Sequence, residues 1–361
     1  MRSVGFNVTK HSVKAKTRAV ANWIWLIAIV ISGVAAIAKE QSSSARIDQT
    51  AFVRLGGIDQ WISIRGESRA NPVLLVVHGG PGEAQWPQDE VYRPWEKDFI
   101  VVQWDQRGSG HTFGRYGTKT PDVTLDRISK DGVELAVYLC GNLSKKKIIV
   151  LGHSWGSLVA TRMVQIRPDL FAAYVGTGQA ASWMVLVKTQ YDLLLAKARK
   201  DGNEATVKEL EAIGRPGPTN GDHWSFLNKY NFRSLWASSD QEWLHHLRSQ
   251  AAELKAREPE QFKNLEDGMQ FTGEQVIPDQ IATDLPKTAC DIHTAYFVIQ
   301  GQEDVITPTQ AAVEYFKCVK APKKELILIP NAGHFAFMTA SDKFLEALTS
   351  KVRPVAIARG A

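Results

Sequence analysis

The stretch that decides the fold is Ile148-Ile149-Val150-Leu151 followed by Gly152-His153-Ser154-Trp155-Gly156. The first four residues predict a buried strand, and the residues from Ser157 to Arg167 show a helical pattern. A strand that ends in Gly-x-Ser-x-Gly and turns directly into a helix is typical of a nucleophile elbow, in which flanking glycines let a strained serine project over the sheet edge. Ser154 is therefore the candidate nucleophile. The alternative is a serine that only caps a helix.

A glycine-rich loop follows a second apolar run. Pro72 to Val77 predicts a strand buried on both faces of a parallel sheet, and it leads into His78-Gly79-Gly80-Pro81-Gly82. Such a loop turns backbone N–H groups inward, so we expect Gly80 to supply one oxyanion donor and the amide of Trp155 to supply the other. A plain Gly/Pro turn is the alternative.

The acid and the base are expected after the last two strands. Ala295 to Gln300 predicts a strand, and Asp304 in the loop that follows is the candidate acid, with Glu303 as competitor and an ordinary turn or cap aspartate as a further alternative. His334 follows the final strand, Glu325 to Pro330, and is the candidate base. The order Ser154, Asp304, His334 is that of a known class of serine hydrolases. Structural or surface roles are expected for His78, His153, His245 and His246.

Three motifs together carry a family resemblance: His78 to Gly82, Asp105-Gln106-Arg107-Gly108-Ser109-Gly110, and Gly152 to Ser157. The chain resembles the proline iminopeptidase group of α/β-hydrolases from about Phe52 to its C-terminus. The resemblance implies an α/β-hydrolase fold, with a mostly parallel sheet flanked by helices, and an aminopeptidase that releases an N-terminal residue, preferably proline, from short peptides. In that group acidic cap residues bind the free amine, and the candidates here are Glu204, Glu209, Glu211, Asp240, Glu242 and Glu253.

The alternation of strands and helices divides the chain. An antiparallel edge hairpin is predicted from Ala51–Leu55 and Gln60–Ile64, within a first core part at 51–180. Helical and polar stretches at 181–285 predict a cap over the active site, and the core resumes at 286–361. Asp105 and Arg107 could pair and brace the active-site loops, a structural role, with substrate contact as the alternative.

Two other functions remain open. An esterase or small amide hydrolase would use the same serine chemistry without an amine pocket. A non-catalytic binding protein on a hydrolase fold is the more remote alternative. An epoxide hydrolase or dehalogenase is disfavoured because such enzymes carry aspartate where this chain has Ser154.

The N-terminus predicts export. Residues 1–18 are basic, and residues 19–38 carry no charge, which suits either a transmembrane signal anchor or a cleaved signal peptide ending near Ala36-Ile37-Ala38. The polar residues 39–50 predict a linker. The catalytic domain is then expected to be membrane-anchored outside the cytoplasm, or exported as a periplasmic or secreted protein.

Composition and cysteines set further limits. A net charge of +5 without a basic, aromatic-rich patch gives no indication of nucleic-acid binding. Cys140, Cys290 and Cys318 lack metal-ligand spacing, and no metal or organic cofactor is expected. Cys290 and Cys318 either form a disulfide, as an oxidising compartment would allow, or are buried thiols with Cys140. The expected partner is a small peptide or ester substrate, and the oligomeric state is left open.

Overall fold

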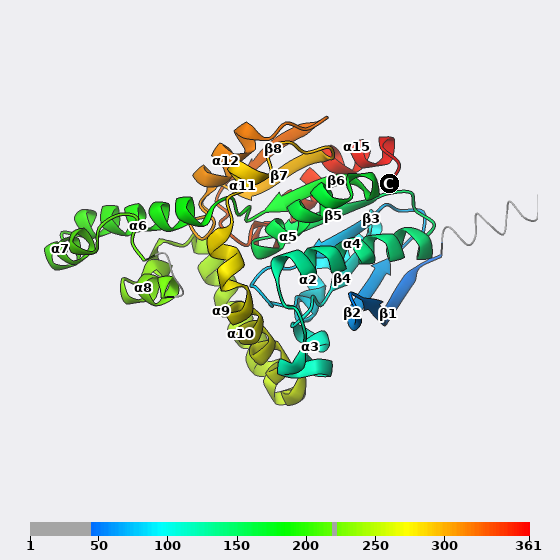
Figure 1. Cartoon of the computed structure of the whole chain (residues 1–361), viewed down its shortest axis with the longest axis horizontal. Coiled ribbons are helices and arrows are strands. Elements are labelled where there is room, and N and C mark those ends of the chain that lie inside the picture. The colour runs from blue at the N-terminus through cyan, green and yellow to red at the C-terminus, as the bar shows by residue number, and fades with distance from the viewer. Residues whose placement is uncertain (1–44, 219–221) are drawn as a thin grey trace, which may run out of the picture.

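The computed structural model describes residues 45–218 and 222–361, whose strands build a mixed eight-stranded sheet (Figure 1). The strand order is β1-β2-β4-β3-β5-β6-β7-β8. β1 pairs antiparallel with β2, and β2 with β4, whereas all the other neighbours are parallel. The strands are β1 (Ile47–Leu55), β2 (Ile58–Gly66), β3 (Val73–Val77), β4 (Ile100–Trp104), β5 (Ile148–His153), β6 (Phe171–Thr177), β7 (Ala295–Gly301) and β8 (Lys324–Ile329).

The central strands are buried on both faces because helices cover both sides of the sheet. Along β3, Val73, Leu75 and Val77 belong to one hydrophobic core, while Leu74 and Val76 belong to the other. The period of two that alternates side chains across a strand produces this division. It explains why the sequence shows continuous apolar runs rather than alternating ones.

Helices α4 and α5 contribute to the first core, and α13, α14 and α15 contribute to the second. The α-helices are α2 (Asp89–Tyr92), α3 (Gly110–Tyr116), α4 (Leu125–Asn142), α5 (Trp155–Ile166), α6 (Trp183–Lys200), α7 (Glu204–Ile213), α8 (His223–Lys229), α9 (Ser238–Arg257), α10 (Pro259–Ala282), α11 (Leu285–Thr288), α12 (Thr309–Cys318), α13 (Ala336–Thr339), α14 (Ser341–Ala347) and α15 (Arg353–Ala358). Short helical turns are η1 (Trp86–Gln88), η2 (Arg93–Lys97), η3 (Gly117–Lys119), η4 (Pro168–Leu170), η5 (Phe232–Leu235) and a π-turn, η6 (Leu348–Val352).

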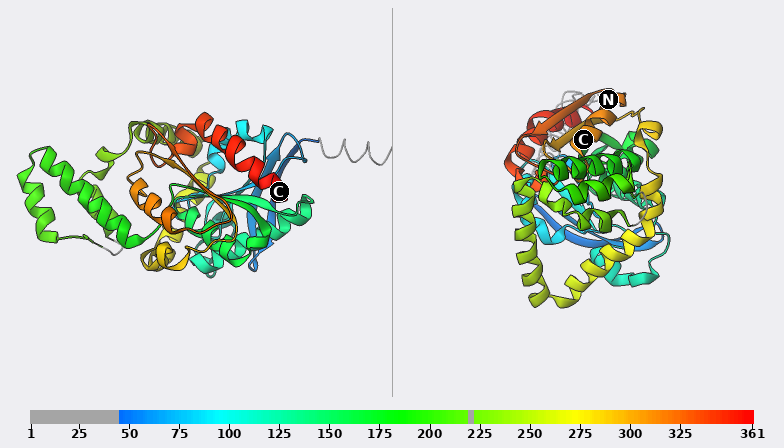
Figure 2. Two further views of the ribbon diagram at one scale, coloured as in Figure 1. Left: turned by 90° about the horizontal axis from the view of Figure 1, so that it is seen from above. Right: turned by 90° about the vertical axis from the view of Figure 1, so that its left-hand side faces the viewer.

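Helices α6 to α11 occupy the chain between β6 and β7. Helices α6, α7 and α8 form an arm that extends away from the sheet, and α9 and α10 form a V-shaped helical pair (Figures 1 and 2). The arm has its own small core, which includes Tyr191, Leu194, Leu210 and Phe232. Helix α10 packs against α3, which ties the V-shaped pair to the core.

Only the residues from 45 onward can be compared with the predictions for the N-terminal part of the chain. The predicted hairpin lies at the sheet edge as β1 and β2, but β1 begins at Ile47, so the end of the predicted linker 39–50 belongs to a strand. The backbone of Ile47–Gln49 pairs with β2, which the polar composition of that stretch does not reveal. The predicted basic segment 1–18 and apolar segment 19–38 lie outside the described residues. Among the residues that are described, none of the helices is long and apolar enough to cross a membrane.

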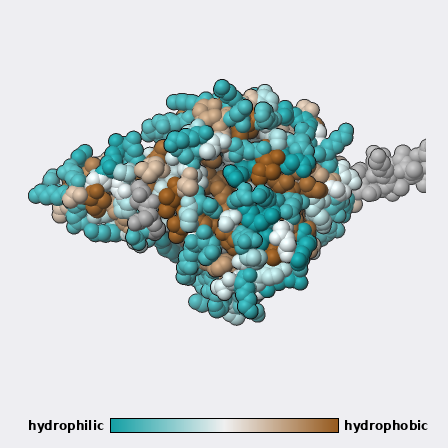
Figure 3. Space-filling view, in the orientation of Figure 1, coloured by the Kyte–Doolittle hydropathy of each residue, from teal (hydrophilic) through white to brown (hydrophobic). Residues whose placement is uncertain are grey.

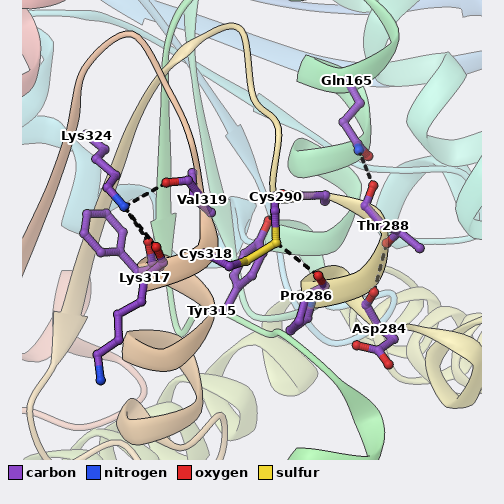
Figure 4. Close-up of a disulfide and its surroundings, with 12 residues drawn as sticks. Gln165, Asp284, Pro286, Thr288, Cys290, Tyr315, Lys317, Cys318, Val319 and Lys324 are labelled. Carbon is purple, nitrogen blue, oxygen red and sulfur yellow. Dashed lines mark hydrogen bonds between the residues drawn. A yellow bond between two sulfur atoms is a disulfide. The ribbon is translucent and has the colours of Figure 1, made fainter.

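Cys290 and Cys318 form a disulfide (Figure 4). Cys290 lies shortly before β7 and Cys318 ends α12, and their Cα atoms are 5.4 Å apart. The adjoining backbone is paired as well, since Lys320 donates its N–H to the carbonyl of Cys290 at 2.6 Å. The disulfide alternative from the sequence is therefore confirmed. Cys140 is a free thiol.

The expected ion pair between Asp105 and Arg107 is wrong. Arg107 is fully buried and donates instead to Asp131, with Nε 2.8 Å from Oδ2. Asp105 accepts a bond from His111 Nδ1 at 2.8 Å. Residue 131 lies in α4, so only the tertiary structure brings this partner to the loop. A buried charge requires a hydrogen-bonded partner, and Asp131 provides it.

Glycine is required on both sides of Ser154 because neighbouring backbone leaves no room for a Cβ atom. A Cβ at Gly156 would lie 2.5 Å from the carbonyl oxygen of His78 and would overlap that of Val77. At Gly152 a Cβ would lie 2.7 Å from the Cα of Ser157. The start of α5 therefore lies directly against the end of β3.

We expect Gly156→Ala to lower the free energy of unfolding by about 2 kcal/mol, because the added methyl overpacks a backbone contact that cannot move independently of β3. Gly273→Ala is the matched control, since that glycine lies inside α10 with open space at its Cβ position. The control should gain about 0.5–1 kcal/mol from helix propensity. Urea denaturation measures both, and equal effects would contradict the contact argument.

Candidate active site

Ser154 sits between β5 and α5 in a backbone conformation that is rare for a side-chain-bearing residue, with φ 53° and ψ −120°. Its N–H donates to the carbonyl of Thr177 at 3.0 Å, which anchors the turn to the end of β6. The Ser157 hydroxyl donates to the carbonyl of Ser154 at 2.6 Å. Strain of this kind persists only when the surroundings fix it, and it lifts the serine side chain clear of the helix.

His334 and Asp304 form a buried pair in the loops after β8 and β7. His334 Nδ1 lies 2.9 Å from Asp304 Oδ2, and the two residues are 4% and 3% exposed. Glu303, the competing acid, is exposed. A carboxylate on Nδ1 favours the tautomer with the proton on that nitrogen, which leaves Nε2 free to accept one.

Asp304 is held by several donors besides His334. Its Oδ1 accepts the N–H groups of Ile306 and Thr307 at 2.8 and 3.0 Å. Its Oδ2 accepts Gln300 Nε2 and the Thr307 hydroxyl, both at 2.8 Å. This network orients the carboxylate toward the imidazole. Gln300 and Thr307 were not singled out from the sequence, because an uncharged residue near a loop acid has no distinctive spacing.

Gly178 connects the surroundings of Ser154 with those of His334. Gly178 follows Thr177, the residue that binds the Ser154 amide, and a Cβ at Gly178 would lie 2.8 Å from His334 Cε1. Gly79 of the glycine-rich loop approaches from the other side, where a Cβ would lie 3.1 Å from Ser154 Cβ. The structure therefore brings the serine, the histidine and the loop together, although they lie far apart in the sequence.

Gly80 and Trp155, the predicted oxyanion donors, line the same cavity as Ser154. The cavity is partly open to solvent, and helices α6, α8 and α10 supply part of its wall. None of its lining residues carries a formal charge. The lining is Gly80, Ser154, Trp155, Leu158, Ala180, Ala181, Ser182, Trp183, Leu186, Trp224, Gln280, Thr283, Ile306 and Thr307.

Apolar surface continues outward from this cavity. Met184 and Trp224 are 49% and 48% exposed, and Trp224 also lines the cavity. Figure 3 shows brown, hydrophobic surface where the arm meets the body of the molecule. The approach to Ser154 therefore suits an uncharged or apolar portion of a substrate.

The predicted amine-binding carboxylates of the cap are mostly distant or engaged. Glu204, Glu209 and Glu211 lie on α7 in the outer arm, where Glu209 pairs with Lys229 and Glu211 with Arg199. Glu242 and Glu253 are exposed on α9. Of the six, only Asp240 contacts the loop that carries His334.

Asp240 is 1% exposed and binds the backbone around His334. Its Oδ2 accepts the N–H of His334 at 2.7 Å, and its Oδ1 accepts that of Phe335 at 3.2 Å. A Cβ at Gly333 would overlap this carboxylate, so glycine is needed there. Asp240 is thus a positioning residue on α9, and the sequence offered no signal to separate it from the other cap carboxylates.

The four other histidines considered from the sequence are either buried in hydrogen-bonded positions or exposed on the surface. His78 Nε2 lies 3.1 Å from the Ser109 hydroxyl, and burial lowers the pKa of His78 to about 4. His153 Nε2 lies 3.2 Å from the carbonyl of His334, and burial lowers the pKa of His153 well below its ordinary value. His245 and His246 are exposed on α9. In residues 45–218 and 222–361, no group of His, Cys, Asp or Glu side chains is arranged to hold a metal ion.

The charge around His334 favours its protonated form. Burial opposes protonation, but the charge of Asp304 and its hydrogen bond, with further contributions from Asp240 and Glu83, raise the pKa of His334 above its ordinary value. A base must be neutral to accept a proton, so activity should rise with pH through a pKa above about 6.5.

We expect Asp240→Asn to lower kcat about tenfold, because the amide cannot accept both backbone N–H groups. Removal of its charge should also move the acid limb of the kcat/KM profile to lower pH, since one of the anions that raise the pKa of His334 is lost. Steady-state kinetics from about pH 5 to 9 measure both effects. Glu242→Gln, on the exposed side of the same helix, is the matched control. An unchanged pH profile would refute this role of Asp240.

Comparisons with known proteins agree with this arrangement. A family model described as the alpha/beta hydrolase fold matches residues 72–341. The probable aminopeptidase YbaC of Bacillus subtilis is 26% identical over 314 residues, which cover 83% of this chain and 94% of that protein. A proline iminopeptidase of Lacticaseibacillus rhamnosus is 25% identical, over 79% and 91% of the two chains.

A solved structure shares the architecture. The crystal structure of a proline iminopeptidase-related protein from Thermus thermophilus matches with a TM-score of 0.58 at 19% identity, over 87% of this chain and 98% of that one. At this identity the likeness concerns the fold. It confirms the mostly parallel sheet flanked by helices that the sequence motifs predict.

Proposed function

The chain belongs to the α/β-hydrolase fold family, and on this premise we propose that it is a serine hydrolase that works by acyl transfer. The observation that carries the proposal is that the strained Ser154 and the buried His334–Asp304 pair border two adjacent residues, Thr177 and Gly178. A structural serine would need neither the strained conformation nor an oriented imidazole beside it.

The proposed reaction follows from the positions of these groups. His334 Nε2 takes the proton of the Ser154 hydroxyl as the oxygen attacks an ester or amide carbonyl. The N–H groups of Gly80 and Trp155 stabilise the oxyanion, each by about 2.7–4 kcal/mol. His334 then gives its proton to the leaving group, and water releases the acyl group from Ser154. These steps use the side chains and backbone of the chain itself and require no cofactor.

As the substrate we propose a short peptide with a free N-terminus, from which the enzyme releases the first residue, preferably proline. Relatives named as aminopeptidase and proline iminopeptidase support this choice. The negative charges of Asp240 and Glu83 near His334 also support it, because a protonated amine is attracted to such a site. The indole rings of Trp183 and Trp224 offer apolar faces for a proline ring.

Ester or small-amide hydrolysis is the second candidate function. The observation in its favour is the uncharged lining of the cavity beside Ser154, which has no group that selects for an amine. The same serine, histidine and oxyanion donors would serve this reaction. The two functions therefore differ in what the substrate carries next to its carbonyl.

A panel of chromogenic aminoacyl amides and short-chain esters separates the two. We expect the purified chain to cleave a prolyl amide, and Ser154→Ala to lose at least about a thousandfold of that activity, because the nucleophile is removed. Turnover of esters without turnover of any free aminoacyl amide would replace the peptidase proposal with the esterase. Failure of Ser154 to react with a fluorophosphonate in folded protein would remove the hydrolase proposal itself.

For the location, we propose that the catalytic domain acts outside the cytoplasm, either anchored by residues 19–38 or exported after their cleavage. The Cys290–Cys318 disulfide supports this, since disulfides persist mainly in oxidising compartments. In non-reducing alkylation of protein from expressing cells, we expect Cys140 to be labelled once the protein is denatured, and Cys290 and Cys318 to be labelled only after reduction. Three thiols labelled without reductant would contradict the proposal.

A further inference from the structure

Three carboxylates influence the catalytic histidine, and they differ in what they bind. Asp304 is held by the network described above, and Asp240 accepts two backbone N–H groups. Glu83 also acts on His334 through its charge. Within the described residues, the Glu83 side chain accepts no hydrogen bond and forms no ion pair. Of the three carboxylates, Glu83 is the one without a hydrogen-bonded or ion-paired partner among the described residues.

The position of Glu83 is fixed by its backbone. It follows the glycine-rich loop directly, and its N–H donates to the carbonyl of Gly79 at 3.3 Å. A Cβ at Gly80 would lie 3.0 Å from Glu83 Cβ, so Glu83 stands beside an oxyanion donor. At Gly82 a Cβ would lie 2.9 Å from the carbonyl of Gly268 in α10, so the cap helix holds this turn against the core.

The surroundings of Glu83 leave its charge poorly matched. The residue is half-buried, and burial raises the pKa of its carboxyl group, an effect that the charge of His334 offsets in part. No arginine or lysine among the described residues lies within ion-pairing distance of this carboxyl group. A charge that is only partly compensated in such a position costs free energy in the free enzyme. A cationic group on the substrate would recover that free energy on binding.

We propose that Glu83 binds the protonated N-terminal amine of an aminoacyl substrate and thereby selects free amines over neutral esters. This inference rests on the aminopeptidase function proposed above. It assigns amine binding to a residue directly after the glycine-rich loop rather than to the acidic residues of the cap. It also separates two tasks, because the uncharged cavity receives the apolar portion of the substrate while Glu83 receives the ammonium group.

The experiment compares Glu83→Gln with the unmodified chain at about pH 7, where an α-amino group is mostly protonated. The substrates are a prolyl para-nitroanilide and para-nitrophenyl butyrate, and Glu90→Gln, an exposed position in the same segment, is the matched control. We expect kcat/KM for the prolyl substrate to fall about tenfold or more, mainly through KM, because the uncharged amide supplies no negative charge to pair with the substrate's ammonium group. Ester turnover and fluorophosphonate labelling at Ser154 also feel the charge of Glu83 through His334, but neither probe carries an amine, so both should fall several-fold less than prolyl turnover when each protein is assayed at its own pH optimum.

Each outcome decides the proposal. An equal loss on both substrates, or no loss on the prolyl substrate, would overturn the assignment of Glu83. If the unmodified chain cleaves esters but no free aminoacyl amide, the aminopeptidase function fails by itself. Competitive inhibition of ester turnover by prolinol, an ammonium compound without a carbonyl, then tests Glu83 separately. Inhibition that is weakened about tenfold in Glu83→Gln would support the ammonium site, and equal inhibition of both proteins would reject it.

Discussion

The close approach of α5 to the end of β3 is the contact on which the site depends. Gly156 lies against the carbonyl oxygens of Val77 and His78, and no side chain fits between them. This contact holds Ser154 at a positive φ, a conformation that costs about 1–3 kcal/mol and survives only where the surroundings impose it. The same contact places the glycine-rich loop after β3 beside the serine, so one packing constraint positions both the proposed nucleophile and a proposed oxyanion donor.

His334, the proposed base, is held both at its ring and at its backbone. Core residues orient its ring, since Asp304 binds Nδ1 and Thr307 and Gln300 hold Asp304. The cap orients its backbone, since Asp240 on α9 binds the N–H groups of His334 and Phe335. A helix inserted between β6 and β7 therefore takes part in shaping the proposed catalytic site. Changes in the cap would be expected to alter the reaction rate along with substrate choice.

The site has an uncharged region beside Ser154 and a negatively charged region around His334. The cavity beside Ser154 has no charged lining residue, whereas the surroundings of His334 carry the charges of Asp304, Asp240 and Glu83. Negative charge near the imidazole stabilises the imidazolium that forms during acyl transfer, because opposite charges attract strongly where little water screens them. The same charge raises the pKa of His334, so it limits activity at low pH while it assists the reaction at neutral pH.

The sequence by itself determined the strands, the elbow and the order of Ser154, Asp304 and His334, because these features depend on local patterns: apolar runs, flanking glycines and loops at strand ends. It predicted the edge hairpin and offered the Cys290–Cys318 pair as one of two alternatives. The tertiary structure alone decided that Arg107 pairs with Asp131 rather than Asp105, that Asp240 holds the His334 backbone, and that Glu83 lacks a partner among the described residues. Each of these depends on which groups meet across elements distant in the chain, and a charged residue in a sequence looks the same whether its partner is water, a neighbour or a backbone amide 94 residues away.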